Sequence, residues 1–343
     1  MKRSAIVTCL LVTLVMFLFM MLAPTAQAQQ KTITLNYSIF SPATHKTSVL
    51  ADEWAKEVEK RTNGLVKTTV FHGGTLTPPT QAYDGVVKGL SDIAQGVFSY
   101  HRGRFPLTEF SDLPLGVKDC VVIAKMFNEY YQKFKPKEME DVKIMYLHGN
   151  PPAILHTAKK PVNKLEDIKG LKIRVTPNGT PIVKALGAAP VAMPMPDVYD
   201  SLSKGVVDGG MLPSEALEGW KLGEVVKYTT ETYSIGYTSA FYVIFNKQKW
   251  DSLPPSAQKV IEQVNQEWIE RTGKGWNEID ASGRAFLQKL GGRLIPLSKE
   301  EGDRWAKAVQ PVLDDYVKMT KEKGLPGDQV LKFAQDYLKQ HQK

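Results

Sequence analysis

The sequence predicts an α/β protein made of two units, each built around a largely parallel sheet. Strand-like and helix-like segments alternate between residues 32 and 97, and the same order of elements returns between residues 165 and 210. The C-terminal third has the periodicity of helices. A chain of 343 residues is also long for a single core, which favours two domains or one bilobal unit.

The first unit is expected to run strand, helix, strand, helix, strand. Apolar residues alternate from Ile33 to Ile39, as in a half-buried strand, and helical spacing follows until an Asn63-Gly64 stop signal. The predicted elements are a strand over 32–39, a helix over 41–62, a strand over 66–71, a helix over 80–88 and a strand over 93–97.

The second unit is expected to repeat this arrangement. Its predicted elements are a strand over 171–175, a helix over 181–186, a helix over 198–204 capped by Asp197, and the run Val206-Val207 leading into Asp208. A β-rich run over 233–245 would cross back to the first unit. Further helices are predicted over 119–133, over 257–272 with a long continuation to 290, over 299–323 and near the C-terminus. No internal sequence repeat is evident.

The N-terminus has the pattern of a secretory signal peptide. Lys2 and Arg3 precede an apolar run over 5–22, and a small-x-small triplet ends at Ala28. We therefore expect export to the periplasm with cleavage after Ala28, which makes residues 1–28 the signal peptide. An uncleaved anchor is the alternative, because the apolar run is long. No later run is long enough to span a bilayer, so the mature chain is expected to be soluble.

The composition and the motifs favour a binding protein over an enzyme. The formal net charge is +8, but basic and acidic residues are interspersed, which argues against nucleic acid as a partner. Cys120 is the only cysteine after the signal peptide, so no intramolecular disulfide can form, as is common in a bacterial periplasm. The sequence has no metal-ligand spacing, nucleophile elbow, phosphate loop or dinucleotide motif. We therefore expect no cofactor and no metal.

One charge in a predicted buried strand needs a partner. Arg174 stands between Ile173 and Val175, and an ion out of water is costly unless it is paired. No acidic residue lies within the strand. The partner is therefore either a distant carboxylate of this chain or the carboxylate of a ligand.

Several short segments occur in a characteristic order. They are Glu59-Lys-Arg-Thr-Asn-Gly64, Val70-Phe-His-Gly-Gly-Thr-Leu76, Gly89-Leu-Ser-Asp-Ile93, Asp167-Ile-Lys-Gly-Leu-Lys-Ile-Arg-Val175, Ala185-Leu-Gly-Ala188, Asp197-Val-Tyr199 and Gly205-Val-Val-Asp-Gly209. In this order the chain resembles, nearly from end to end, the DctP-type extracytoplasmic solute-binding proteins of tripartite ATP-independent periplasmic (TRAP) transporters. The joint order carries the resemblance, because no single segment is specific.

The resemblance implies a two-lobed periplasmic binding protein fold, in which each lobe is a mixed sheet flanked by helices. Crossing strands and a long hinge-spanning helix would join lobe 1 (29–151 and 238–280) to lobe 2 (152–237 and 281–343). It also implies capture of an organic acid and delivery to the small and large membrane permease subunits. In this family the arginine of the Lys-Ile-Arg strand binds the ligand carboxylate, and the matching residue is Arg174. A guanidinium fits a carboxylate in a two-pronged geometry. We expect a monomer.

Departures from the family pattern indicate an apolar pocket. Where the family often has Asp-Gly-Gln-Glu-Asn-Pro, this chain has Asp208-Gly-Gly-Met-Leu-Pro213, which places Leu212 at the position of a ligand-binding Asn. Binders of sialic acid and many sugar acids have a further Arg where this chain reads Ala153-Ile-Leu-His-Thr157. An apolar lining disfavours a hydroxyl-rich or doubly charged ligand.

We therefore expect a pocket for a small organic monocarboxylate with an aromatic or hydrophobic body. Arg174 would hold the carboxylate, and aromatic rings would enclose the rest. The other predicted ligand-binding residues are Phe40, His45, Phe98, Tyr100, Thr176, Met195, Leu212, Trp220, Tyr237 and Phe241.

Other roles stay open at this point. A C4-dicarboxylate would need a second cation, for which the candidates are His45, Arg102 and Arg104. The loaded protein could instead be the ligand input to a sensor kinase. An exported α/β enzyme whose catalytic residues are distant in sequence is the third alternative.

Overall fold

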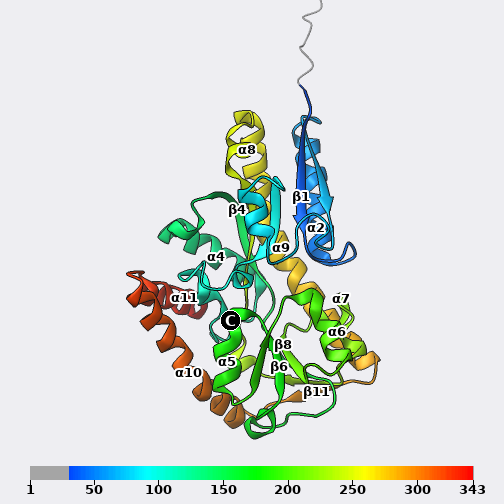
Figure 1. The fold of residues 1–343 in the computed structure, drawn as a ribbon, viewed down its shortest axis with the longest axis vertical. Coiled ribbons are helices and arrows are strands. Elements are labelled where there is room, and N and C mark those ends of the chain that lie inside the picture. The colour runs from blue at the N-terminus through cyan, green and yellow to red at the C-terminus, as the bar shows by residue number, and fades with distance from the viewer. Residues whose placement is uncertain (1–30, 343) are drawn as a thin grey trace, which may run out of the picture. The chain divides into compact units, whose positions relative to one another are not determined.

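The computed structural model describes residues 31–342, and the fold below is that of residues 33–342. The predicted signal peptide and its cleavage after Ala28 lie outside the described residues. Two mixed sheets flanked by helices confirm the predicted α/β class (Figure 1). Within the described part, no helix combines the length and the apolar character that crossing a membrane requires.

The first sheet contains the strands that were predicted near the N-terminus. It consists of β1 (Ile33–Ile39), β2 (Val66–Phe71), β3 (Ile93–Val97), β4 (Val142–Gly149) and β10 (Ala240–Asn246), in the order β2-β1-β3-β10-β4. β1 is parallel to both β2 and β3, whereas β10 is antiparallel to β3 and β4. The predicted bounds of β2 and β3 are confirmed, and β4 was not predicted.

The second sheet contains the strand of Arg174. It consists of β5 (Ile154–Thr157), β6 (Lys172–Val175), β7 (Ala189–Ala192), β8 (Gly209–Leu212), β9 (Tyr228–Glu231) and β11 (Arg293–Pro296), in the order β11-β9-β5-β8-β6-β7. β6 is parallel to both of its neighbours, β7 and β8. The strand β6 was predicted, whereas β5, β7, β9 and β11 were not.

The connections between the two sheets match the predicted crossing pattern. The predicted run over 233–245 begins with a short 3₁₀ turn and a single bridge between Ala153 and Tyr237, and its second half is β10. The helix α9 (Pro255–Lys289) is 35 residues long. It packs on α2 (Lys46–Arg61) and α4 (Cys120–Phe134) beside the first sheet, and on α7 (Ala216–Gly219) beside the second (Figure 1).

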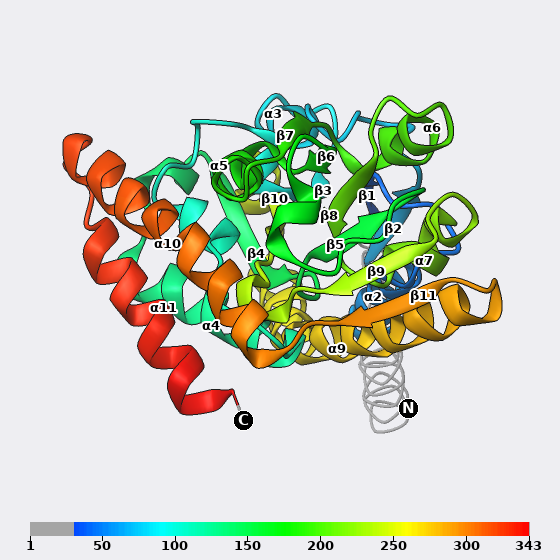
Figure 2. The same ribbon diagram turned by 90° about the horizontal axis from the view of Figure 1, so that it is seen from below.

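The remaining helices flank the sheets, and the last two form the C-terminal part of the chain. They are α3 (Ala82–Val87), α5 (Thr180–Ala185), α6 (Val198–Ser203), α8 (Lys247–Asp251), α10 (Lys299–Glu322) and α11 (Gly327–His341). α10 packs on α5, and α11 packs on α4, so the C-terminal helices contact both halves of the fold (Figure 2).

The first helix, α2, begins later than the sequence predicted. His45 has an extended backbone (φ −69°, ψ 141°), and its Nδ1 atom accepts a hydrogen bond from the backbone N–H of Thr47. His45 is therefore the N-cap, and the helix begins at Lys46 instead of near residue 41. Residues 40–45 form a loop, which carries side chains into the pocket described below.

The two halves contain a structural repeat that the sequence did not reveal. Gly89 (φ +73°) ends the turn after α3, and Gly205 (φ +69°) ends the turn after α6. Three residues further on, Asp92 and Asp208 each accept a hydrogen bond from a backbone N–H of the neighbouring strand, at 2.7 and 2.8 Å. The same turn therefore precedes β3 in one half and β8 in the other. In the sequence, the two turns share the pattern Gly-x-x-Asp.

Candidate ligand-binding site

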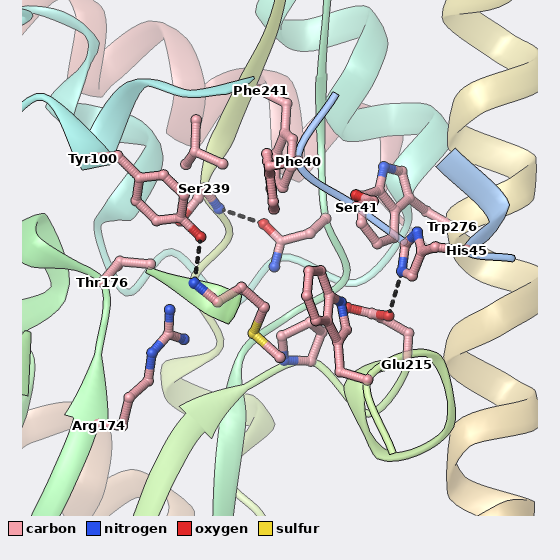
Figure 3. A pocket seen from close by; sticks show the side chains of 15 residues that line it. Phe40, Ser41, His45, Tyr100, Arg174, Thr176, Glu215, Ser239, Phe241 and Trp276 are labelled. Carbon is pink, nitrogen blue, oxygen red and sulfur yellow. Dashed lines mark hydrogen bonds and ion pairs between the residues drawn. The ribbon is translucent and has the colours of Figure 1, made fainter. Parts of the chain in front are cut away.

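A pocket lies between the two sheets, at the ends of strands from both. Segments after β1, β3 and β4 contribute side chains from the first sheet, and β6 and β8 lead into it from the second, as expected for α/β proteins. The space between the lining atoms, which includes open solvent, is about 440 Å³. It is lined by Phe40, Ser41, His45, Val97, Tyr100, Asn150, Arg174, Thr176, Met195, Pro213, Glu215, Trp220, Ser239, Phe241 and Trp276 (Figure 3).

Arg174 is a buried cation at the edge of this pocket. It is the third residue of β6 and only 3% exposed. Its Nε and Nη2 atoms both donate to the carbonyl oxygen of Met193, at 3.1 and 2.8 Å. Within residues 31–342 it forms no ion pair with a carboxylate. The structure therefore excludes the first partner that the sequence left open, a distant carboxylate among these residues.

Aromatic rings form the opposite wall. Phe40 stacks on both Trp220 and Phe241, with centroid distances of 6.2 Å and interplanar angles of 23° in each case. Trp276 reaches the pocket from α9, and its Nε1 atom donates to Nδ1 of His148 at 3.0 Å. Burial lowers the pKa of His148 to about 3, so the ring is neutral and keeps this acceptor. The hydrogen bond holds Trp276 in place at the wall.

Two polar contacts beside the pocket join the halves of the fold. The phenolic oxygen of Tyr100 accepts a hydrogen bond from the backbone N–H of Met195 at 3.1 Å, and burial raises the pKa of this phenol (Figure 3). Behind the pocket, Asp112 Oδ1 accepts from Ser239 at 2.8 Å and from Thr176 at 3.3 Å. Burial raises the pKa of Asp112 to about 7.

A third polar contact joins His45 of the first half to Glu215 of the second half, at another part of the pocket wall. The Nε2 atom of His45 lies 2.9 Å from Oε2 of Glu215, and both residues are 3% exposed. The backbone N–H of Glu215 donates to Asp280 of α9 at 3.1 Å. Burial raises the pKa of Asp280 to about 6. The long helix thus fixes the segment that carries Glu215.

Eight of the eleven predicted ligand-binding residues line this pocket. They come from both halves of the fold, as a site between two lobes requires. These residues are Phe40, His45, Tyr100, Arg174, Thr176, Met195, Trp220 and Phe241.

The structure does not place Phe98, Leu212 or Tyr237 among the lining residues. Phe98 packs against other aromatic rings of the core, and Leu212 and Tyr237 are each 1% exposed. Val97 and Pro213, their chain neighbours, line the pocket instead of Phe98 and Leu212. Phe98 begins a 3₁₀ turn directly after β3, and Leu212 is the last residue of β8.

Seven lining residues were not predicted: Ser41, Val97, Asn150, Pro213, Glu215, Ser239 and Trp276. None of them belongs to a motif. Position at a strand end was a usable signal for Asn150 and Ser239, which follow β4 and precede β10. Glu215 had no such signal, because its partner lies 170 residues away. Arg102 and Arg104 do not line the pocket, and Arg104 pairs with Asp84 and Asp141.

The model of the bacterial extracellular solute-binding protein family 7, DctP, matches residues 37–319. The chain belongs to this family. DctP-family proteins are periplasmic solute-binding components of TRAP transporters and not enzymes. They bind small organic acids and work with membrane permease subunits.

Solved structures of similar proteins include three TRAP solute-binding proteins. One from Desulfovibrio salexigens, solved as an open complex, is 31% identical, with a TM-score of 0.80 over 91% of this chain and 97% of that chain. A marine metagenome protein specific for aromatic acid ligands, in complex with metahydroxyphenylacetate, is 28% identical, with a TM-score of 0.87 over 91% and 100%. A protein from Rhodoferax ferrireducens, in complex with copurified benzoate, is 28% identical, with a TM-score of 0.86 over 90% and 98%.

Proposed function

We propose that this DctP-family protein captures a small organic monocarboxylate with an aromatic or hydrophobic body and delivers it to a TRAP permease. The observation that carries the proposal is the state of Arg174. It is a buried cation that has no acidic partner within residues 31–342, and it borders a cavity walled by aromatic rings. A ligand carboxylate would supply the missing anion.

A neighbouring hydroxyl group, that of Tyr100, would complete a carboxylate site around Arg174. The Tyr100 oxygen already accepts a bond from Met195, so its own proton is available to a ligand oxygen. Thr176 lines the same pocket, but its hydroxyl group donates to Asp112. Charge-assisted hydrogen bonds of this kind are about twice as strong as neutral ones.

The apolar wall supports an aromatic body for the ligand. Phe40 and Phe241 stack on one another, and Trp220 and Trp276 extend the wall on either side. Rings in this arrangement gain from offset or edge contacts with a planar ligand. The relatives that hold benzoate or metahydroxyphenylacetate bind ligands of this chemistry, which supports the same class here.

The charges around the pocket argue against a C4-dicarboxylate. Arg104 is engaged with two carboxylates outside the pocket, and Arg102 is exposed. His45 lines the pocket, but Glu215 occupies its Nε2 atom. A second ligand carboxylate would therefore meet an anion, which is unfavourable where water is excluded.

We propose that the protein acts as a monomer whose lobes, 29–151 with 238–280 and 152–237 with 281–343, close over the ligand. The contacts Tyr100–Met195 and His45–Glu215 would form on closure, so a ligand that touches both lobes favours the closed state. Export with cleavage after Ala28 belongs to the same proposal.

Ligand binding can be tested on protein purified from the periplasm. Native mass spectrometry would identify a copurifying acid, and refolding from guanidinium would remove it before calorimetry. We expect phenylacetate, phenylpyruvate or indole-acetate to raise the melting temperature more than succinate or malate does. Stronger stabilisation by the dicarboxylates would overturn the proposed ligand class.

A further inference from the structure

The His45–Glu215 pair is a second polar group at the pocket, distinct from the arginine. Figure 3 shows Arg174 and this pair on opposite sides of the pocket. His45 comes from the loop after β1 and Glu215 from the segment after β8. A ligand held at Arg174 by its carboxylate would thus point its other end towards the pair.

The hydrogen bonds of His45 indicate which hydrogen bond the Glu215 carboxylate accepts from it. The backbone N–H of Thr47 donates to Nδ1 of His45 at 3.2 Å, so in the neutral ring the proton is on Nε2 and is donated to Oε2 of Glu215. The other carboxylate oxygen, Oε1, has no hydrogen-bond partner within residues 31–342. A carboxylate can accept about four hydrogen bonds, so Oε1 of this pocket residue can accept one from a ligand.

The pair is held rigidly. A Cβ atom at Gly219 would lie 2.9 Å from Cδ2 of His45 and 3.0 Å from Oε2 of Glu215, so the backbone of α7 packs directly on both side chains. Asp280 binds the backbone of Glu215 from the other side. Glu215 is therefore a preorganised acceptor, and it does not need to reorient for a ligand.

We propose that Glu215 is a specificity-determining residue that accepts a hydrogen bond from a ring hydroxyl of the ligand. This inference rests on the proposed function, because it requires a carboxylate at Arg174. It assigns hydroxylated aromatic monocarboxylates as the preferred substrate class. The negative charge of Glu215 also excludes acids with a second carboxylate at the far end of the ring.

Calorimetry with matched ligands tests the proposal. The series is phenylacetate, its 3- and 4-hydroxy forms, the corresponding methyl ethers and 4-carboxyphenylacetate. We expect wild type to bind one hydroxylated isomer at least about tenfold more tightly than phenylacetate, since bonds to charged groups are the strong ones. The methyl ether, which lacks the donor, should lose that gain.

Glu215→Gln should reduce this preference to about threefold or less, because the neutral amide is a weaker acceptor. The same variant should bind 4-carboxyphenylacetate at least about tenfold more tightly than wild type. Glu224→Gln is the matched control, because Glu224 lies outside the pocket and bonds to Tyr199. It should reproduce the wild-type ratios.

The possible failures are distinguishable. If Glu215 is only a structural link between the lobes, Glu215→Gln weakens all these ligands equally, which overturns the proposal. If phenylacetate binds through Arg174 but a hydroxyl group adds nothing, the assignment of Glu215 is wrong and the proposed function stands. If no aromatic acid binds to wild type, the proposed function fails, and this inference fails with it.

Discussion

Replacing Arg174 with methionine should weaken ligand binding strongly and should not lower the stability of the ligand-free protein appreciably. Methionine keeps much of the length of the side chain and removes the charge. Arg174 is 3% exposed and bonds only to the carbonyl of Met193 within the described residues. Under the proposed function its charge contributes to ligand binding, and we expect that charge to contribute little to the free energy of unfolding of the ligand-free protein.

The expected magnitudes follow from these contacts. Removing one partner of a buried charged pair costs about 2–5 kcal/mol, which corresponds to a loss of affinity of roughly 30- to 4,000-fold. In the ligand-free protein, the lost bonds to Met193 are worth about 1.5–3 kcal/mol. Relief of the buried charge offsets this loss. The melting temperature of the free protein should therefore stay within about 2 °C of wild type, or rise.

The assay is calorimetry for affinity and thermal unfolding for stability, on protein freed of bound acid by refolding. Arg104→Met is the matched control, because Arg104 pairs with Asp84 and Asp141 outside the pocket. It should bind the acid normally and unfold at a slightly lower temperature, since partly exposed ion pairs contribute about 0–1 kcal/mol. Unchanged affinity of Arg174→Met would refute the role of Arg174. A large drop in its melting temperature without ligand would refute the reasoning about stability.

Two further predictions concern groups behind the pocket. Burial raises the pKa of Asp112 from its ordinary 3.8 to about 7, so between those values the folded protein holds a proton that the unfolded chain has released. This group therefore lowers the free energy of unfolding by up to about 4 kcal/mol as pH rises from about 4 to 7. In urea titrations the advantage of Asp112→Asn over wild type should grow across that range, and a constant difference would contradict the assignment. Gly283→Ala should destabilise the protein by about 1–3 kcal/mol, because its Cβ atom would lie 2.0 Å from the carbonyl oxygen of Ser214. Gly302→Ala in α10, whose nearest contact would be 3.4 Å, should be neutral or stabilising, and equal losses in both variants would show that the contact at Ser214 is not the cause.

Local sequence patterns predicted the strands whose limits are marked by residues within or next to the strand. The strands β2 and β3 have the predicted bounds, because apolar residues and turn signals within a few residues define them. The start of α2 was wrong by about five residues, because the cap is a histidine and not one of the usual capping residues. β4 was missed, although it is eight residues long, because it is buried almost throughout and does not alternate.

Neighbouring residues at the ends of two strands show why the lining of the pocket was only partly predictable. Phe98 and Leu212 were predicted to line it, but Val97 and Pro213 do. The sequence identifies the segment, whereas the pairing of a strand with its neighbours decides which of its two faces meets the cavity. A displacement by one residue reverses the direction of the side chain.

By itself the sequence indicated the family of this protein and the charged residue most relevant to binding. The order of short segments pointed to the DctP family, and an arginine in an apolar strand predicted an anchor for an anion. Only the tertiary structure showed that Arg174 has no acidic partner within residues 31–342. It also showed that Glu215 forms a hydrogen bond with His45 at the wall of the pocket. These facts depend on contacts between residues as much as 170 positions apart, which arise when the two sheets pack together and leave no local trace.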